Sequence, residues 1–375
     1  SPFGRMWAIG VVWAILAAAW APAGSRATQP QSPTSRPSGS PATKSFEIKE
    51  IELADGTARK YAIFTPLQYD QDPTHRWPVL VSLHGSPDCG TDGKRQTREA
   101  LPKIIAGRRS SFPFITVMPQ AKTLWFRGDD AEAVWRMLEA VHAAYRTDRD
   151  RVYLTGISMG GFATWELSML RPDVFAAIVP VSGVGPTQYA SNIAHLPIWA
   201  FHGSKDRNVA VAGSRDPIEA LRKLGSDPKY TEYRNKPHKI WSLVYRPQTL
   251  WRWLLKQRRG PAPRVIDYKL MTTSATVWWL ALRVDPNHDA GSESPPHIRA
   301  EIGTDGKITI RSEGVAFWSI ESNREPLEPG TPIEVEWNGK VVFRGEFPGV
   351  ISVQPAATED ADSKRGSPRT PTESR

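Results

Sequence analysis

The sequence predicts a doubly wound, mostly parallel α/β sheet followed by a small all-β, sandwich-like domain. Short, continuous apolar runs alternate with helical stretches in the first two thirds of the chain, which is typical of buried parallel strands joined by helices. After residues 258–263, which contain Gly and Pro, the pattern changes to alternating strands and turns without a helical stretch. We therefore expect an α/β domain over residues 45–260 and a β-sandwich over residues 264–353.

The two ends of the chain have a different composition. Arg5 precedes an apolar stretch at 7–20, which is followed by Ala21-Pro22-Ala23, and this order predicts a signal peptide over residues 1–27. Fourteen helical residues span only about 21 Å, so an uncleaved membrane anchor is the weaker alternative. Residues 28–44 and 354–375 are polar and predict a disordered linker and tail. We expect an exported protein, secreted or periplasmic, with no stable membrane insertion after cleavage of the signal.

The α/β domain starts with an antiparallel hairpin, because residues 46–53 alternate apolar and polar and a second strand at 61–64 follows the turn at Asp55-Gly56. Helical periodicity marks residues 129–145, 162–170, 217–224 and 248–255. The apolar runs expected to form buried strands are 79–83, 114–118, 152–154, 176–181, 198–201 and 230–233.

Charge and cysteine content exclude some function classes. The net charge is +9, but the arginines are scattered and no nucleic-acid-binding motif accompanies them, so we expect a solvated basic surface and no nucleic-acid partner. The single cysteine, Cys89, cannot form an internal disulfide. It lies in a polar loop far in sequence from an arranged base, which argues against a nucleophilic role.

The segment Gly156-Ile157-Ser158-Met159-Gly160-Gly161 lies between a predicted strand and a predicted helix. Glycines two residues before and two after the serine permit a sharp turn that lifts the serine hydroxyl out of the sheet. This context predicts the nucleophile elbow of an α/β-hydrolase fold, with Ser158 as the nucleophile. The alternative is a serine in an ordinary glycine-rich turn.

A nucleophilic serine needs a histidine to take its proton and a carboxylate to orient that histidine. In α/β hydrolases the acid and then the histidine follow the serine along the chain. Asp206 follows the 198–201 strand and His238 follows the next strand, both at the carboxyl edge of the sheet, so we predict them as acid and base. The other histidines after Ser158 either flank the 198–201 strand or belong to the β-domain: His195, His202, His288 and His297.

The developing oxyanion needs backbone donors, usually the N–H after the nucleophile and one from the loop after an early strand. These positions are Met159 and Ser86, with Gly85 as the alternative second donor. His84 is expected to hold this loop by hydrogen bonds. Trp125 lies in a loop just after a strand and is a candidate for lining the substrate pocket together with His84 and Gly85.

The motifs together resemble the secreted esterases related to polyhydroxybutyrate depolymerase and feruloyl esterase, which are often labelled phospholipase/carboxylesterase or prolyl-oligopeptidase-like. The resemblance covers about residues 46–259 and implies an ester-cleaving serine hydrolase without a metal or organic cofactor, with Ser158, Asp206 and His238 at the triad positions. It rests on the segments 76–85, 90–94, 153–161, 199–206 and 230–233.

The histidine loop departs from the family pattern. The family usually has Gly-His before Asn or Ser and then Trp, whereas this chain has Lys236-Pro237-His238-Lys239-Ile240-Trp241. Proline fixes φ and restricts the preceding residue, so the loop is expected to be held differently, with a weaker activity as one outcome.

The leading hypothesis is an exported carboxylic-ester hydrolase that acts on an ester substrate, with an acylated carbohydrate or a polyester as candidates. One alternative is a serine peptidase of the prolyl-oligopeptidase type. Another is a catalytically weak surface protein that binds carbohydrate through the β-domain, with Trp318 or Trp337 as the sugar-stacking residue, although a structural role for this domain is favoured. The acyl and alcohol groups and the oligomeric state stay open.

Overall fold

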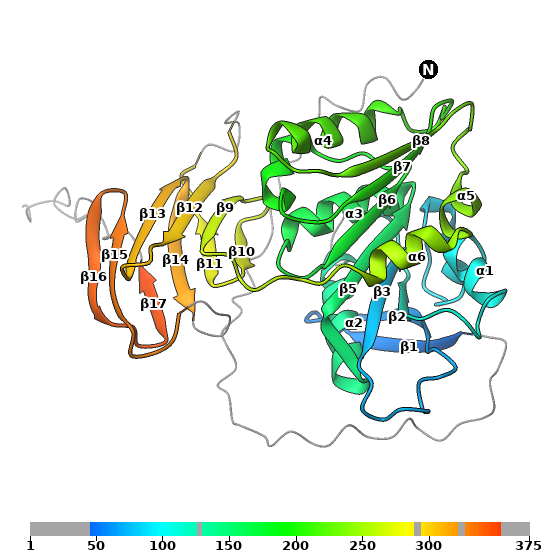
Figure 1. The fold of residues 1–375 in the computed structure, drawn as a ribbon, viewed down its shortest axis with the longest axis horizontal. Helices are drawn as coiled ribbons and strands as arrows, with labels where there is room; N and C mark the ends of the chain where they lie inside the picture. Colours follow the sequence, from blue (N-terminus) through cyan, green and yellow to red (C-terminus); the bar gives the residue numbers. More distant parts are fainter. Residues whose placement is uncertain (1–45, 126–129, 289–293, 322–326, 354–375) are drawn as a thin grey trace, which may run out of the picture. The chain divides into compact units, whose positions relative to one another are not determined.

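The computed structural model describes residues 46–125, 130–288, 294–321 and 327–353 (Figure 1). The predicted signal peptide at 1–27, linker at 28–44 and tail at 354–375 lie outside the described residues.

The first part of the described chain is an eight-stranded sheet with the order β1-β2-β4-β3-β5-β6-β7-β8. The β1–β2 hairpin is antiparallel, as expected, and β2 runs antiparallel to β4, whereas β3 to β8 are all parallel. Parallel strands end at the same edge of a sheet, so the loops after β5, β7 and β8 gather there. The strands are β1 (Glu47–Glu52), β2 (Ala58–Phe64), β3 (Trp77–Leu83), β4 (Ile115–Pro119), β5 (Thr147–Ile157), β6 (Ala177–Val181), β7 (Trp199–Gly203) and β8 (Lys229–Tyr233).

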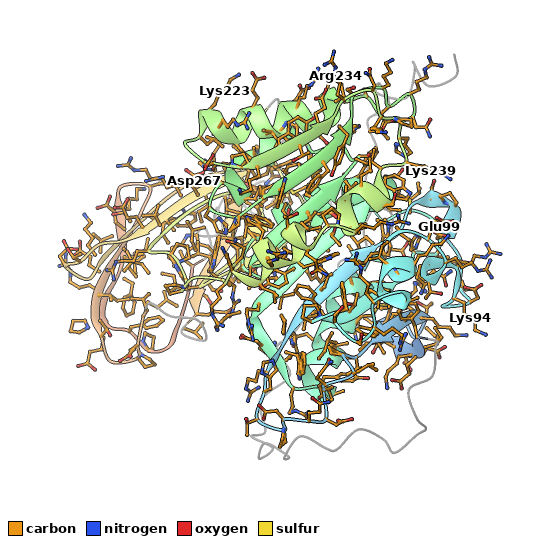
Figure 2. The ribbon with its side chains drawn as sticks, turned by 45° about the vertical axis from the view of Figure 1, so that its right-hand side comes forward. Lys94, Glu99, Lys223, Arg234, Lys239 and Asp267 are labelled. Atoms are coloured by element: carbon orange, nitrogen blue, oxygen red, sulfur yellow. The ribbon has the colours of Figure 1, made fainter. Side chains whose placement is uncertain are left out.

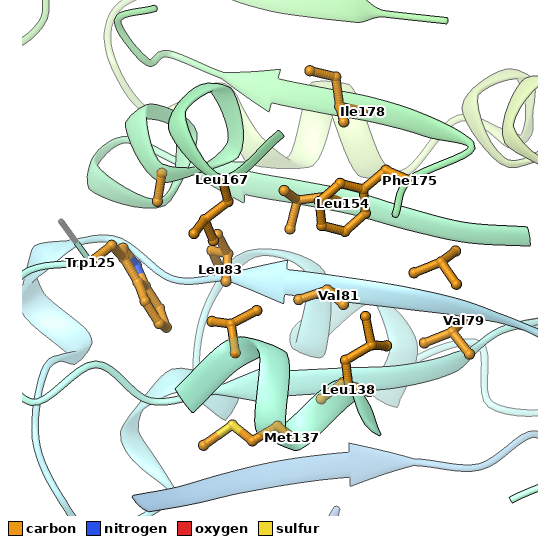
Figure 3. Close-up of a cluster of buried hydrophobic side chains, with 14 of the residues drawn as sticks. Val79, Val81, Leu83, Trp125, Met137, Leu138, Leu154, Leu167, Phe175 and Ile178 are labelled. Carbon is orange, nitrogen blue, oxygen red and sulfur yellow. The ribbon is translucent and has the colours of Figure 1, made fainter. Parts of the chain in front are cut away.

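Helices cover both faces of this sheet, and alternate strand residues point to opposite faces. Val79, Val81 and Leu83 of β3 pack into the core cluster that contains residues of α2, α3 and α4, part of which Figure 3 shows. Leu80 packs on the opposite face with residues of α1, α5 and α6. The helices are α1 (Ala100–Ala106), α2 (Asp130–Ala144), α3 (Met159–Leu170), α4 (Ala212–Lys223), α5 (Trp241–Tyr245) and α6 (Gln248–Leu255).

Two helices were not predicted, and one starts earlier than its sequence pattern indicates. Helices α1 and α5 are seven and five residues long, too short to show a clear helical period. Helix α4 begins five residues before Pro217, which lacks the N–H that would bond to the Gly213 carbonyl. That carbonyl instead accepts the N–H of Gly185 at 3.1 Å, so the proline is tolerated inside the helix.

The second part contains two sheets around a separate buried core, as expected for a sandwich-like domain. One sheet has the order β10-β11-β14-β17, and the other has the order β16-β15-β13-β12-β9, in which only the β13–β15 pair is parallel. The strands are β9 (Val265–Lys269), β10 (Ser274–Val277), β11 (Leu280–Val284), β12 (His297–Ile302), β13 (Lys307–Glu313), β14 (Val315–Glu321), β15 (Pro332–Trp337), β16 (Lys340–Glu346) and β17 (Val350–Val353).

Neither tryptophan suggested for sugar stacking has a freely exposed ring. Trp318 is 0% exposed and lies in the core of the β-domain, so it cannot contact a glycan in this fold. Trp337 is half-buried, packs edge-on against Trp318 at 5.8 Å between ring centroids, and donates its indole N–H to Ser312 Oγ at 2.9 Å. The burial of Trp318 removes it as a candidate for sugar stacking, since an aromatic in a strand pattern can face either the core or solvent.

Hydrogen bonds connect β9 with the short 3-10 helix at Thr187–Ile193 and with α3. Asn192 donates its side-chain amide to the Lys269 carbonyl and accepts the Lys269 N–H, both at 2.9 Å. The Tyr268 hydroxyl donates to the Leu170 carbonyl at 3.1 Å.

No helix within the described part of the chain is long and apolar enough to cross a membrane.

Candidate active site

Ser158 lies between β5, which ends at Ile157, and α3, which begins at Met159. Its backbone has φ 54° and ψ −120°, a conformation that non-glycine residues rarely adopt. The Ser158 N–H donates to the Val181 carbonyl at 2.9 Å, and the Ser158 carbonyl accepts the N–H groups of Gly161 and Phe162. The neighbouring strand and the first turn of α3 thus hold the strained turn on both sides.

The flanking glycines are required by the close approach of backbone segments. A Cβ atom at Gly156 would lie 2.1 Å from the Gly160 carbonyl oxygen, and one at Gly160 would lie 2.3 Å from the Leu83 carbonyl oxygen. Real Cβ atoms do not approach backbone oxygens so closely. The glycines therefore allow the end of β3, the end of β5 and the start of α3 to meet at the serine.

We expect Gly156→Ala to lower the free energy of unfolding by about 3 kcal/mol or more, because the clash is with backbone and cannot be relieved by a side-chain rotation. Gly260→Ala is a matched control, since no atom lies within 4 Å of its added Cβ. Urea unfolding of the two variants measures the difference. Equal midpoints for both variants would contradict the close packing at the elbow.

Ser158, His238 and Asp206 form a continuous hydrogen-bonded chain. His238 Nε2 lies 2.9 Å from Ser158 Oγ, and His238 Nδ1 lies 2.6 Å from Asp206 Oδ2. The Asp206 side chain is 0% exposed and the His238 side chain 12%. Because an ionised carboxylate only accepts hydrogen bonds, Nδ1 of His238 carries the hydrogen, which leaves the Nε2 lone pair facing the serine.

Backbone groups hold the Asp206 carboxylate in place. Its Oδ1 atom accepts the N–H groups of Asn208 and Val209, both at 2.9 Å. These bonds close an Asx-type turn directly after β7. Oδ2 is thereby directed to His238.

The histidine loop lies close over the end of β7. A Cβ at Gly203 would be 2.4 Å from the Pro237 carbonyl oxygen, so the glycine of His202-Gly203 makes room for this loop. Lys205 N–H donates to the Lys236 carbonyl, and Ser182 Oγ donates to the His238 carbonyl. The loop is therefore fixed through its carbonyl groups, and the missing N–H of Pro237 takes no part in these contacts.

Lys239, the other unusual residue of the loop, is exposed and is labelled in Figure 2. The His238 ring instead meets Trp241 edge-on, with 5.2 Å between the ring centroids. The departures from the family pattern thus leave His238 within hydrogen-bonding distance of both Ser158 and Asp206.

The loop after β3 passes beside Ser158, since a Cβ at Gly85 would lie 3.6 Å from Ser158 Cβ. This places the backbone of Gly85 and Ser86, the predicted oxyanion donors from this loop, next to the elbow. Met159, the other predicted donor, is the first residue of α3.

His84 fixes this loop through both ring nitrogens. Nε2 accepts the Ala121 N–H at 3.0 Å, so Nδ1 carries the hydrogen and donates to the Gly85 carbonyl at 2.7 Å. Burial lowers the pKa of His84 to about 4, so the ring is neutral near pH 7.

Trp125 has a supporting role that differs from the expectation. Its side chain is 2% exposed, and its indole N–H donates to the His84 carbonyl at 2.9 Å. The two rings are in contact, with centroids 4.8 Å apart. Trp125 therefore supports the loop from the core and is not an exposed wall of a pocket; the position after a strand could not distinguish these two environments.

The neutral state of His84 predicts an acid-dependent loss of stability. The folded-state pKa, about 4, lies below the ordinary value of 6.5, so the unfolded chain binds the proton more tightly. The contribution to the free energy of unfolding is present above pH 6.5 and is lost as the pH falls toward 4, by up to about 3 kcal/mol. Burial gives His142 the same direction of shift, so part of the acid sensitivity has a second source.

Urea unfolding at pH 7 and pH 4.5 tests this prediction. We expect His84→Gln to lose less stability between the two pH values than the unaltered chain, because glutamine does not titrate. His75→Gln, at an exposed histidine, is the matched control and should behave like the unaltered chain. An unchanged pH dependence in His84→Gln would contradict the assignment.

A small pocket lies beside the elbow, lined by His84 and Ile157 together with two acidic residues, Asp88 and Glu99. Burial and the nearby charge of Glu99 raise the pKa of Asp88.

The sequence argues against His202 as the base, because it flanks the 198–201 strand and no strand then follows for an acid. His202 is fully buried, and its Nε2 atom lies 3.2 Å from Asp206 Oδ2. The four-residue spacing of His202 and Asp206 across the turn after β7 was the feature of the sequence that could have indicated this contact.

The described residues contain no group of three or more His, Cys, Asp or Glu side chains arranged to hold a metal ion.

Together, the fold and this hydrogen-bonded Ser–His–Asp arrangement are those of an α/β hydrolase. Residues 61–220 match the family model described as Esterase PHB depolymerase, which confirms the resemblance over this segment. A solved structure described as a thermostable esterase is 30% identical, with a TM-score of 0.53, and the match covers 57% of this chain and 63% of that one. This likeness confirms the predicted fold class.

Two curated relatives are also similar. The bifunctional acetylxylan esterase/xylanase XynS20E of Neocallimastix patriciarum is 27% identical over 66% of this chain and 38% of the relative. Poly(3-hydroxyalkanoate) depolymerase C of Paucimonas lemoignei is 28% identical over 38% of this chain and 44% of the relative. The aligned region thus spans less than half the length of either protein.

Proposed function

We propose that this chain hydrolyses carboxylic esters, with Ser158 as nucleophile, His238 as general base and acid, and Asp206 as the group that orients His238. The observation that carries the proposal is the pair of contacts of 2.9 Å from His238 Nε2 to Ser158 Oγ and 2.6 Å from His238 Nδ1 to Asp206 Oδ2. The match of residues 61–220 to an esterase family supports the same chemistry.

In the first half of the reaction, His238 Nε2 takes the hydroxyl proton while Ser158 Oγ forms a bond to the ester carbonyl carbon. The carbonyl oxygen becomes an oxyanion, which the N–H groups of Met159 and Ser86 would stabilise from the two sides of the elbow. The bond from the carbonyl carbon to the alcohol oxygen then breaks. His238 gives its proton to the leaving alcohol, and the acyl group stays on Ser158.

In the second half, water replaces the alcohol. His238 Nε2 takes a proton from water as the water oxygen attacks the acyl carbon. The bond to Ser158 Oγ then breaks, the acid leaves, and the serine regains its proton from His238. The negative charge of Asp206 stabilises the imidazolium that forms in each half of the reaction.

For the substrate we propose a neutral ester of a carbohydrate or a polyester. The names of the two similar enzymes support this class, one being an acetylxylan esterase and the other a poly(3-hydroxyalkanoate) depolymerase.

Labelling by a fluorophosphonate probe, followed by peptide mapping, tests the nucleophile, and a panel of acetyl, longer acyl and feruloyl esters with matched peptide amides tests the reaction. We expect one labelled residue, Ser158, and hydrolysis of at least one ester class in preference to its amide. Labelling elsewhere, or turnover of amides alone, would contradict the proposal. An unlabelled chain without turnover would favour the binding-protein alternative.

We further propose that the chain is exported, on the basis of the charged, apolar and small residues in its first 27 positions. N-terminal sequencing of the protein released outside the cytoplasm tests this. A mature chain that still begins with residues 1–20 would contradict signal cleavage.

A further inference from the structure

A second histidine contacts the acid of the triad from the interior of the protein. His202, near the end of β7, has a side chain that is 0% exposed. Its Nε2 atom lies 3.2 Å from Asp206 Oδ2 and 3.1 Å from the Val209 carbonyl oxygen, and its Nδ1 atom lies 2.8 Å from Ser214 Oγ. Every polar atom of the ring therefore has a partner.

These partners determine which nitrogen carries the hydrogen. The Val209 carbonyl and the ionised Asp206 carboxylate can only accept, so Nε2 must be the donor. Burial is the main cause of a lowered pKa for His202, so the ring is neutral and Nδ1, which carries no hydrogen, can only accept. Ser214 Oγ lies 2.8 Å from Nδ1 and 3.2 Å from the Gly183 carbonyl oxygen, and its one hydrogen is assigned to the nearer Nδ1. His202 is thus held as a fixed N–H donor behind the carboxylate.

The carboxylate of Asp206 accepts three hydrogen bonds and has His202 Nε2 as a fourth polar contact. Oδ1 receives two backbone N–H groups, and Oδ2 is shared between His238 Nδ1 at 2.6 Å and His202 Nε2 at 3.2 Å. A donor that shares Oδ2 fixes the rotation of the carboxylate. The N–H dipole of this donor also weakens the electrostatic effect of the Asp206 carboxylate on His238.

We propose that His202 is a positioning residue, whose Nε2–H holds Asp206 and limits how strongly Asp206 favours the protonated form of His238. This inference rests on the proposed function, because it assigns His202 a part in the same triad.

The other charged groups near His202 leave this assignment intact. Glu232 of β8 is the strand neighbour of His202, and Arg215 of α4 pairs with it through contacts of 2.6 and 2.8 Å. The hydrogen bonds from Arg215 are the main cause of a lowered pKa for Glu232, so this pair keeps its charges across the neutral range. Removal of the His202 Nε2–H donor is therefore expected to change the electrostatic interaction between Asp206 and His238 and not the charges of Glu232 and Arg215.

The test compares two amide variants that separate the two ring nitrogens. In His202→Gln the terminal amide reaches the place of Nε2 and can still donate to Asp206. In His202→Asn the shorter amide reaches only the place of Nδ1, near Ser214. His202→Phe fills the volume of the ring without any donor and is a second donor-free variant if His202→Asn does not fold.

The readout is the pH profile of kcat/KM for ester hydrolysis, with the concentration of folded sites counted by fluorophosphonate titration. Loss of one hydrogen bond to a carboxylate should move the acid limb to higher pH by about one unit and lower the plateau about tenfold in His202→Asn and His202→Phe. His202→Gln should keep the acid limb of the unaltered protein and most of its plateau.

A donor-free variant with an unchanged acid limb would overturn the proposal, because a merely structural histidine would reduce only the number of folded sites. Equal shifts in the asparagine and glutamine variants would overturn it as well, since the Nε2 donor would not be the cause. An unaltered protein that hydrolyses no ester would instead contradict the proposed function, so the two failures are distinguishable.

Discussion

Ser158→Ala is expected to lower kcat for ester hydrolysis by about 10,000-fold to 1,000,000-fold, because no other hydroxyl is placed at 2.9 Å from His238 Nε2 among the described contacts. Removal of the nucleophile leaves only binding and oxyanion stabilisation to accelerate the reaction. The fold should persist, since the backbone of Ser158 supplies the hydrogen bonds that hold the elbow.

Initial rates on the best ester of the panel, with unfolding curves of both proteins, give this comparison. Ser111→Ala is the matched control, because Ser111 is exposed and outside the site. It should retain full activity. A Ser158→Ala protein that keeps more than a tenth of the activity would show that the serine is not the nucleophile.

Asp206→Asn is expected to lower kcat by about 10,000-fold while the fold is retained. The two backbone N–H groups that bind Oδ1 will also bind the amide oxygen of asparagine, so the amide NH₂ group takes the place of Oδ2 and faces His238 Nδ1. Nδ1 must then accept, the hydrogen moves to Nε2, and His238 can no longer take the serine proton.

Asp216→Asn, on α4 and exposed, is the matched control and should be fully active. The measurement is kcat at saturating ester, with circular dichroism to establish that both variants are folded. An Asp206→Asn protein within tenfold of the unaltered kcat would show that another acid orients His238.

The elbow and the order of the triad could be predicted because they depend on local patterns. The apolar run before Gly156 and the helix after Gly161 define a strand and a helix on either side of Ser158. Each of Asp206 and His238 follows directly on a strand of the same parallel sheet, so their common edge could be inferred without knowing any distance.

The support behind these residues could not be predicted, because it depends on contacts between segments far apart in the sequence. Trp125 reaches the His84 carbonyl across 41 residues. A periodic pattern records that such a residue is apolar, but not which polar atom its indole meets. The four-residue spacing of His202 and Asp206 places the two residues near each other but does not show which of their polar atoms meet.

The place of His238 after β8 has a consequence for how the enzyme loses activity under stress. β8 is the edge strand of the sheet, paired only with β7, and no residue of it is fully buried. Such strands open at a lower free energy than the centre of a sheet. Ser158 follows the central strand β5, whereas His238 follows the edge strand β8. Mild denaturant should therefore separate His238 from Ser158 while the turn at Ser158 keeps its conformation. Inactivation would then precede the loss of the core, and the amide hydrogens of β8 would exchange earlier than those of β5.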